Sequence, residues 1–448
     1  MMKINQNALK IMDILESGGY EAFAVGGCVH DLILGKFPKD WDITTNALPE
    51  QMLALFEDYH TIPTGLKHGT ITVVLDYEPF ELTTYRVDGV YSDNRRPDTI
   101  AYTSSLTEDL ARRDFTMNAI AYNPKTGIID PFQGQEAIRL KEIKTVGKPE
   151  ERFKEDALRM LRCIRFACQL DGTIDALTYD SLYRNRRLIQ LISIERIREE
   201  INKILLSGCP DRGIKLLYDT GLLQYILPEV CSLADFDQHN PHHHKDVLNH
   251  TLIVLNAVPD NLPLRWAALL HDIGKPKAFT LGEDNIGHFY EHHKGGADMA
   301  REILLRLKFD HDTVRKVGIL VYHHMFKYDT LRDASIKKFI NRVGVENLND
   351  LFELQIADIK GSKPPHDFSQ IKHLRKEVDR ILNEKQPLSM KDLRVNGDDL
   401  VAIGFEPGKR LGDTLRCLME EVLRTPEVND KETLLSMAKR LVKTSDKN

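Results

Sequence analysis

Two short stretches, VGGCVHD at residues 25–31 and KDWDI at residues 39–43, decide the fold that we predict for the first part of this chain. The apolar residues AFAV at 22–25 indicate a buried strand that ends at a glycine pair. Residues 29–34 have the pattern of a helix, and residues 41–44 predict a second strand. This succession is typical of a domain that mixes helices and strands.

The same mixture continues to about residue 145. A hairpin is expected around Asp76-Tyr77-Glu78-Pro79, with strands at 70–75 and 80–85. Beyond about residue 150, apolar residues recur at helical spacing, most clearly at 153–170, 194–206, 212–218, 247–257 and 297–307. We therefore predict an α/β head with a mixed sheet, followed by an all-α neck, body and tail with an inserted helical domain.

Asp40 and Asp42 are the first candidates for chemistry. A strand alternates its faces, so two residues spaced by two point the same way. Two neighbouring carboxylates repel unless a cation lies between them, and Mg²⁺ is the usual cation where phosphates are the substrate. Gly26 and Gly27 allow close backbone approach, and the helix after them offers N–H groups to a phosphate. The alternative for the aspartates is a solvated position on an exposed strand.

A second charged group begins with Arg112 and Arg113 and resumes at Asp156. On the helix predicted at 153–170, Asp156 and three arginines recur every third residue, namely Arg159, Arg162 and Arg165. Salt bridges on a wet helix face are the ordinary role of such residues. A carboxylate beside a guanidinium, however, also matches the edges of cytosine and adenine and disfavours those of G and U. The further arginines are suited to bind phosphates.

These motifs together resemble one family. The glycine pair before Asp-x-Asp, with twelve residues between Gly27 and Asp40, is similar to the signature of polymerase-β-like nucleotidyltransferases. The chain as a whole resembles the class II tRNA nucleotidyltransferases, the bacterial CCA-adding enzymes and their poly(A) polymerase relatives. The resemblance covers about residues 20–210 and includes IERIREEI at 194–201. It returns in the tail at VNGDDL (395–400) and GFEPG (404–408).

The resemblance implies a role for each motif. Asp40 and Asp42 would hold catalytic Mg²⁺, and Glu81 on the following hairpin is the candidate third carboxylate. Asp156 and Arg159 would form an amino-acid template for the base. The rest of the nucleotide would be bound or supported by Gly26, Gly27, His30, Arg112, Arg113, Arg162 and Arg165. His30 is a departure, because the family usually has arginine there, and its contact with the triphosphate is expected to be weaker.

The expected reaction is addition of C, C and A to the 3′ end of tRNA from CTP and ATP. Residues 86–97 look like the flexible loop that enzymes adding only CC lack, so addition of A is expected. Addition of A alone and poly(A) synthesis stay open as alternatives. A further alternative is a phosphohydrolase with a degenerate head.

The phosphohydrolase alternative rests on histidines in the later helices. His250, the pair His271-Asp272 and Asp358 follow the order of the HD phosphohydrolase superfamily, which implies a divalent transition metal. His292 and His324 are expected to contact a phosphate or a second metal. The alternative is that these histidines are structural. The run at 242–244 is expected to be a solvated linker.

Length and composition set the remaining expectations. A chain of 448 residues predicts several domains: a head at 1–145, neck and body at 146–235, an HD domain at 236–365 and a tail at 366–448. The net charge of −6 means that RNA must be bound by local basic surface. No apolar run suits a membrane span, so a cytoplasmic protein without membrane contact is expected. The sequence does not indicate the oligomeric state.

Overall fold

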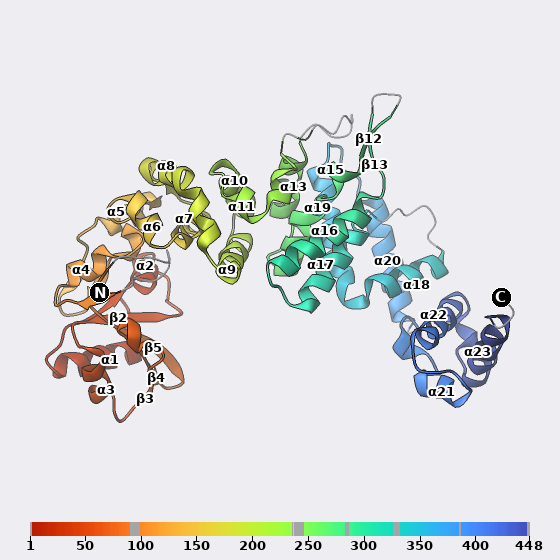
Figure 1. The fold of residues 1–448 in the computed structure, drawn as a ribbon, viewed down its shortest axis with the longest axis horizontal. Helices are drawn as coiled ribbons and strands as arrows, with labels where there is room; N and C mark the ends of the chain where they lie inside the picture. Colours follow the sequence, from red (N-terminus) through yellow and green to blue (C-terminus); the bar gives the residue numbers. More distant parts are fainter. Residues whose placement is uncertain are drawn as a thin grey trace. The chain divides into compact units, whose positions relative to one another are not determined.

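The computed structural model describes residues 2–89, 99–234, 236, 246–282, 286–325, 332–384 and 387–445. The chain divides into two compact units, residues 1–231 and 232–448, which we call the N-terminal and C-terminal units (Figure 1). Within the described residues, no helix is long and apolar enough to cross a membrane. The loop expected at 86–97 lies mostly outside the described residues, and so does the His242–His244 run.

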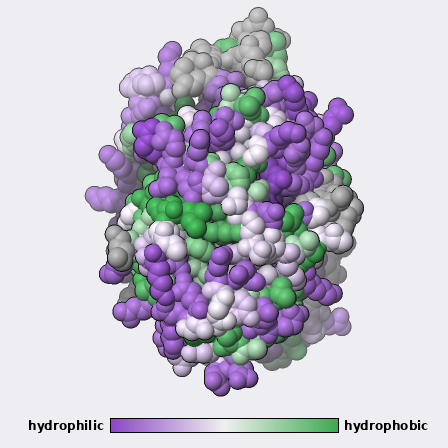
Figure 2. Space-filling model, turned by 90° about the vertical axis from the view of Figure 1, so that its left-hand side faces the viewer, coloured by the Kyte–Doolittle hydropathy of each residue, from purple (hydrophilic) through white to green (hydrophobic). Residues whose placement is uncertain are grey.

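The N-terminal unit begins with a mixed sheet, as predicted; it has seven strands in the order β3-β4-β5-β2-β1-β8-β9. Its strands are β1 Ala22–Val25, β2 Trp41–Thr45, β3 His60–Ile62, β4 Thr70–Leu75, β5 Glu78–Thr84, β8 Ala121–Asn123 and β9 Gly127–Ile129. The neighbouring strands are antiparallel except β2 and β5, which run parallel. The face of this unit seen in Figure 2 is largely hydrophilic, with apolar side chains gathered in a band across it.

Short helices pack on this sheet. Helix α1, Gln6–Ser17, starts at Asn5, whose side chain accepts from the N–H groups of Asn7 and Ala8, and it buries one apolar face. The others are α2 Gly27–Ile33, α3 Pro49–Leu55, α4 Leu106–Ala111 and α5 Gly134–Leu140. Leu106 and Leu110 of α4 share a buried cluster with Phe23 and Val25 of β1. Helix α4 therefore covers one face of the sheet beside β1.

The hairpin β4–β5 turns more tightly than predicted. Strand β5 begins at Glu78, not at residue 80, because Asp76 and Tyr77 both take positive φ, 48° and 65°. Two left-handed residues are enough to close a hairpin whose twist matches its strands. The expectation of a four-residue connection was wrong for this reason.

The single helix predicted at 153–170 is two helices, α6 Pro149–Glu155 and α7 Leu158–Gln169. Asp156 is extended, with φ −139° and ψ 104°, and its carboxylate accepts the N–H of Leu158 at 3.0 Å. A side chain that binds the start of the next helix competes with helix continuation. The apolar periodicity runs through this break, and for that reason the prediction missed it. The stripe of Asp156 with the three arginines is therefore not a stripe on one helix.

The rest of both units is almost entirely helical in the described residues, as expected; the short parallel pair β10 Glu142–Ile143 and β11 Thr173–Ile174 is an exception. The N-terminal unit continues with α8 Ala176–Asn185, α9 Ile194–Leu205, α10 Pro210–Asp219, α11 Leu223–Ile226 and α12 Pro228–Cys231. The C-terminal unit contains α13 Val247–Ala257, α14 Leu262–Leu270, α15 Lys275–Ala278, α16 His292–Arg306, α17 His311–His323, α18 Asp333–Val343, α19 Leu348–Gly361, α20 Ser369–Asn383, α21 Gly397–Ala402, α22 Lys409–Arg424 and α23 Lys431–Ser445. A small hairpin, β12 Phe279–Leu281 and β13 Gly287–Phe289, precedes α16. Helix α16 starts five residues before the predicted position 297. The prediction missed this start because Gly295 and Gly296 interrupt the apolar pattern.

Candidate functional site

Three carboxylates of the head lie on or next to the parallel pair of strands. Asp42 on β2 is the register partner of Glu81 on β5, so the two side chains lie next to each other on one face. Asp40 lies one residue before β2. Burial raises the pKa of Asp42 to about 6; Arg113 opposes this shift, and the charges of Glu81 and Asp40 add to it. The charges of Asp40 and Glu81 thus act on Asp42, and a cation beside this acidic group would relieve that repulsion.

Gly26 lies against this acidic group. Its φ is 77°, a conformation that side chains rarely adopt. A Cβ at this position would lie 3.3 Å from Nη1 of Arg113 and 3.6 Å from Oδ2 of Asp42. The glycine therefore lets the backbone pass between a guanidinium and a carboxylate of the candidate site. Gly27 starts the seven-residue helix α2 and has open space around it.

Arg112 and Arg113 are both held by Asp109, a residue that the sequence reasoning missed. Arg112 donates Nε and Nη2 to Oδ1 of Asp109, at 2.9 and 2.7 Å, and Arg113 donates Nη2 to Oδ2 at 3.2 Å. Burial by itself would raise the pKa of Asp109, but the two guanidiniums lower it below its usual value. Thr44 of β2 also donates to Asp109, at 3.1 Å. The spacing of Asp109 to the arginines, i to i+3 and i+4, was the available signal.

His30 is buried in the middle of α2. Burial lowers its pKa, although Asp31, whose Oδ1 is 3.1 Å from Nδ1, opposes the shift. At neutral pH the imidazole is therefore uncharged. Where the resemblance implies a permanently charged arginine, this chain places a neutral ring.

Asp156 is paired with Arg196 of α9. Arg196 donates Nη2 to Oδ2 at 2.7 Å and Nη1 to Oδ1 at 3.3 Å. This two-point contact joins the residues just before α7 to the motif at 194–201. The predicted partner, Arg159, binds Glu155 instead and donates to the carbonyls of Arg152 and Arg112 at 3.2 and 3.1 Å. The bond to Arg112 places Arg159 beside the arginine pair of the head.

Arg162 and Arg165 each have a buried acidic partner. Arg162 donates Nε to Oδ2 of Asp114 at 2.7 Å, and Nε of Arg165 lies 3.3 Å from Oε2 of Glu200. Burial would raise the pKa of Asp114, but Arg162 and Arg159 lower it to about 2. Both arginines therefore fix α7 to its neighbours in this structure. Asp114 and Glu200 are further residues that sequence reasoning did not single out.

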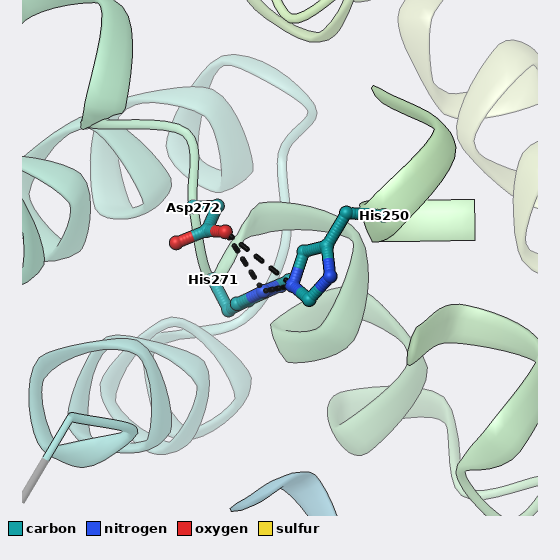
Figure 3. A group of neighbouring side chains, drawn as sticks. All are labelled: His250, His271 and Asp272. Atoms are coloured by element: carbon teal, nitrogen blue, oxygen red, sulfur yellow. Dashed lines mark hydrogen bonds and ion pairs between the residues drawn. The ribbon is translucent and has the colours of Figure 1, made fainter. Parts of the chain in front are cut away.

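A second cluster lies in the C-terminal unit: Figure 3 shows His250 of α13 beside His271 and Asp272, which follow the end of α14. Asp358 of α19 also belongs to it. Nε2 of His250 is 3.2 Å from Nε2 of His271 and 3.0 Å from Oδ1 of Asp358. Oδ2 of Asp272 is 3.2 Å from Nε2 of His271 and 3.6 Å from Nε2 of His250. All four predicted HD residues thus converge, and the His250, His271 and Asp272 atoms are close enough to share one metal ion.

His292 and His324 lie on the other side of Asp272. Their Nε2 atoms are 3.4 and 3.7 Å from Oδ1 of Asp272. Gly274 makes this approach possible, since a Cβ there would lie 2.2 Å from the carbonyl oxygen of His292. Lys275 forms an ion pair of 2.7 Å with Oδ2 of Asp272. Burial would raise the pKa of Asp272, but Lys275 and His271 hold it well below its usual range.

Comparison with known proteins places both sites in recognised domains. The family described as poly A polymerase head domain matches residues 22–144, and the one described as probable RNA and SrmB-binding site of polymerase A matches residues 173–233. The HD domain family matches residues 243–360.

Individual proteins show a similar pattern. The CCA-adding enzyme of Ligilactobacillus salivarius is 33% identical over 440 residues, 98% of this chain and 96% of that protein. The CCA-adding enzyme of Geobacillus kaustophilus is 48% identical over 221 residues, which is 49% of this chain and 54% of that protein. The crystal structure of the Bacillus stearothermophilus CCA-adding enzyme in complex with CTP superposes with a TM-score of 0.73 and 30% identity, covering 99% of this chain and 98% of that one.

Proposed function

The chain belongs to the family of CCA-adding enzymes, and on that premise we propose that it adds C, C and A to the 3′ end of tRNA from CTP and ATP. It is a nucleotidyltransferase, and its reaction is metal-dependent. The observation that carries the proposal is the register of β2 and β5, which sets Asp42 beside Glu81 with Gly26 and Arg113 next to them.

The carboxylates Asp40, Asp42 and Glu81 would hold Mg²⁺. Their oxygen donors suit a hard divalent cation, and so does the raised pKa of Asp42, which is caused mainly by burial and further by the charges of Glu81 and Asp40. Such ions supply activation of an attacking 3′-hydroxyl and stabilisation of the leaving pyrophosphate. Around them, Gly26 and Gly27 leave space for a triphosphate, and Arg113 presents a guanidinium beside Asp42. Arg112 is held beside Arg113 by the same buried carboxylate, Asp109.

Asp156 and Arg159 would select the base. Asp156 accepts hydrogen bonds and Arg159 donates them, which suits the amino group and ring nitrogen shared by cytosine and adenine. Arg196 fixes the Asp156 carboxylate at both oxygens, and Arg162 and Arg165 hold α7 in place. His30, neutral and buried, would contribute little charge to triphosphate binding.

The proposal is tested with tRNA that lacks CCA and tRNA that lacks only the terminal A, each incubated with labelled CTP and ATP. We expect completion of CCA on both substrates by the native chain and loss of incorporation in Asp42→Ala. Asp58→Ala, an exposed aspartate of the same unit, is the matched control. Incorporation by Asp42→Ala at the native rate would refute the metal assignment. Extension only of the tRNA lacking A would favour the A-adding alternative, and a long adenosine tract would favour poly(A) synthesis.

A second candidate function belongs to the HD domain, residues 236–365 by our proposed division, between a neck and body at 146–235 and a tail at 366–448. His250, His271, Asp272 and Asp358 converge at distances suited to one divalent transition metal. Such an ion would support attack of water on the phosphorus of a phosphate ester, with the alcohol as leaving group. Asp272→Ala is expected to abolish hydrolysis of p-nitrophenyl phosphate and to leave nucleotide incorporation unchanged. Hydrolysis that survives this substitution would exclude the site.

A further inference from the structure

Asp109 of α4 uses both oxygens of a fully buried carboxylate to bind donors from several parts of the head. Oδ1 accepts from Nε and Nη2 of Arg112, at 2.9 and 2.7 Å, and from the backbone N–H of Arg86 at 3.4 Å. Nη1 of Arg112 lies 3.8 Å from Oδ2 of a second carboxylate, Asp88. The nitrogens of the Arg112 guanidinium thus all face carboxylates of the protein, so this arginine has little left to offer a ligand.

Arg113 is held differently, by the other oxygen of the same carboxylate. Its Nη2 donates to Oδ2 of Asp109 at 3.2 Å, and Thr44 of β2 donates to that oxygen at 3.1 Å. Within the described residues no other side-chain donor of Arg113 is hydrogen-bonded, and its Nε is buried without a partner. Nη1 lies beside the backbone of Gly26, next to the carboxylate of Asp42. Arg113 therefore keeps unused donors beside the glycine pair.

Arg113 lies near two carboxylates and pairs with only one of them. Its charge acts on Asp42, yet no ion pair joins these two side chains, both of which the structure describes. The bond to Asp109 and an ion pair with Asp42 would compete for the same guanidinium. If Arg113 turned to Asp42, it would occupy a carboxylate of the proposed metal site and withdraw its donors from a phosphate.

We propose that Asp109 is a positioning residue for triphosphate binding, which keeps Arg113 out of an ion pair with Asp42 and directs the remaining donors of that guanidinium to the phosphates. Arg112 braces Asp109 and supports the phosphate contact only indirectly. The inference rests on the nucleotidyl transfer proposed above. It concerns the phosphates and not the base, which the template residues would select.

The sign of the effect separates positioning from simple charge. Removal of a negative charge near an anion site strengthens anion binding when the other groups stay in place. In Asp109→Asn we expect the opposite, weaker binding, because Arg113 is released toward Asp42. The amide is also a poor replacement, since in either orientation its NH₂ group faces donors of Arg112 or of Arg113.

The test measures binding of inorganic tripolyphosphate and of CTP to the full-length chain by calorimetry, without tRNA, first with EDTA and then with Mg²⁺. Asp109→Asn should bind both ligands about tenfold more weakly, the size expected for loss of a charge-assisted contact. The loss should be larger with EDTA, where no cation keeps Arg113 from Asp42. The ratio of the dissociation constants for CTP and UTP should not change. Glu108→Gln, at an exposed position of the same helix, is the matched control.

Two further variants identify the residue through which Asp109 acts. Asp109→Glu retains the charge but displaces it by one methylene, and its affinity for tripolyphosphate should lie between those of the native chain and Asp109→Asn. If the thermal unfolding midpoint shows that Asp109→Asn does not fold, Asp109→Glu must still bind more weakly than the native chain. In an Arg113→Gln background, Asp109→Asn should cause no further weakening, because the side chain that it positions is gone.

Tripolyphosphate binding by Asp109→Asn that equals or exceeds that of the native chain would overturn the inference. A changed ratio for CTP and UTP with unchanged tripolyphosphate binding would also overturn it, since the effect would then fall on the base. Equal weakening in the Arg113→Gln background would refute the action through Arg113. A native chain that binds neither CTP nor ATP would instead refute the proposed function.

Discussion

Asp42 has two properties that both disfavour a charged carboxylate: it is partly buried, and it has other carboxylates as neighbours. Both raise its pKa, to about 6, and the nearby Arg113 only partly offsets them. The metal-free head therefore stores an unfavourable interaction that a bound cation would remove. In the candidate site, residues that were predicted from the sequence contact residues that were not predicted. Asp109 and Arg196 are as closely involved as Arg113 and Asp156, yet Asp109 lies in no quoted motif and Arg196, within the motif at 194–201, was given no role.

The pKa of Asp42 predicts how metal binding depends on pH. Below about pH 6 the carboxyl carries a proton that a metal ion must displace, so Mn²⁺ affinity should fall about tenfold per pH unit. Above pH 7 the affinity should be constant. Titration of a chain with His271→Ala and His324→Gln, which disable the HD site, isolates the head. An affinity that stays level down to about pH 4, where an ordinary aspartate protonates, would contradict the prediction.

Arg196 is expected to act as a positioning residue for the template. In Arg196→Ala the Asp156 carboxylate loses its two-point contact, and the preference for CTP over UTP should fall about tenfold, roughly 1.4 kcal/mol. Arg196→Lys should restore only part of this preference, because an ammonium cannot bind both oxygens in the same plane. Glu199→Ala, at an exposed position of α9, is the control. The readout is kcat/KM for each nucleotide, and an equal loss for both would indicate a merely structural role.

At the scale of elements, the helices and strands that were predicted are those with clear apolar periodicity. Others, such as β3, β8 and β9, had no prediction because they are only three residues long. The misses have identifiable causes. The break at Asp156 depends on a side chain that binds the backbone of the next helix and on a partner in α9, 40 residues away. The start of α16 was hidden by Gly295 and Gly296. The members of the HD cluster were identified from their residue types. The position of Asp272 between two pairs of histidines depends on the packing of α14 against α17 and of the following turn at Gly274 against α16, which no local pattern contains.

Gly274 is the point where this packing is tightest, and its substitution gives a prediction for the element. In Gly274→Ala the new methyl group would meet the carbonyl of His292 at 2.2 Å and the nitrogen of Gly296 at 2.8 Å. We expect a loss of about 1–3 kcal/mol in unfolding free energy and weaker Mn²⁺ binding at the HD site. Gly295→Ala, with open space on the same helix α16, should be neutral or stabilising by up to about 1 kcal/mol. Equal thermal stability of the two variants would contradict the packing argument.

At the scale of the whole molecule, each of the two compact units has its own core and its own candidate site. The carboxylates of the head belong to the N-terminal unit and the HD cluster belongs to the C-terminal unit. A chain built in this way is expected to bind ligands at the two sites independently, and to respond to each ligand in a separate unfolding transition.

Calorimetry of the full chain tests this independence. Mg²⁺ with CTP should raise the midpoint temperature of one transition, and Mn²⁺ at low concentration should raise that of the other. Each ligand should add about 2.7 kcal/mol to the unfolding free energy of its unit at 100 times Kd. Asp42→Asn should abolish only the first response and His271→Ala only the second. A single transition that shifts with either ligand would show that the units unfold together.

The pairing of β2 with β5 also bears on how this protein tolerates change in its length. Asp42 and Glu81 are brought together by backbone hydrogen bonds, so the 38 residues between them do not set their separation in space. A single residue inserted inside β5 would turn Glu81 to the opposite face of the sheet. A much longer insertion in the connection before β3, at residues 57–59, costs only loop entropy, which grows slowly with length. Insertions of whole codons should therefore abolish nucleotide incorporation when they fall inside β2 or β5, and should preserve it when they fall in the connecting loops.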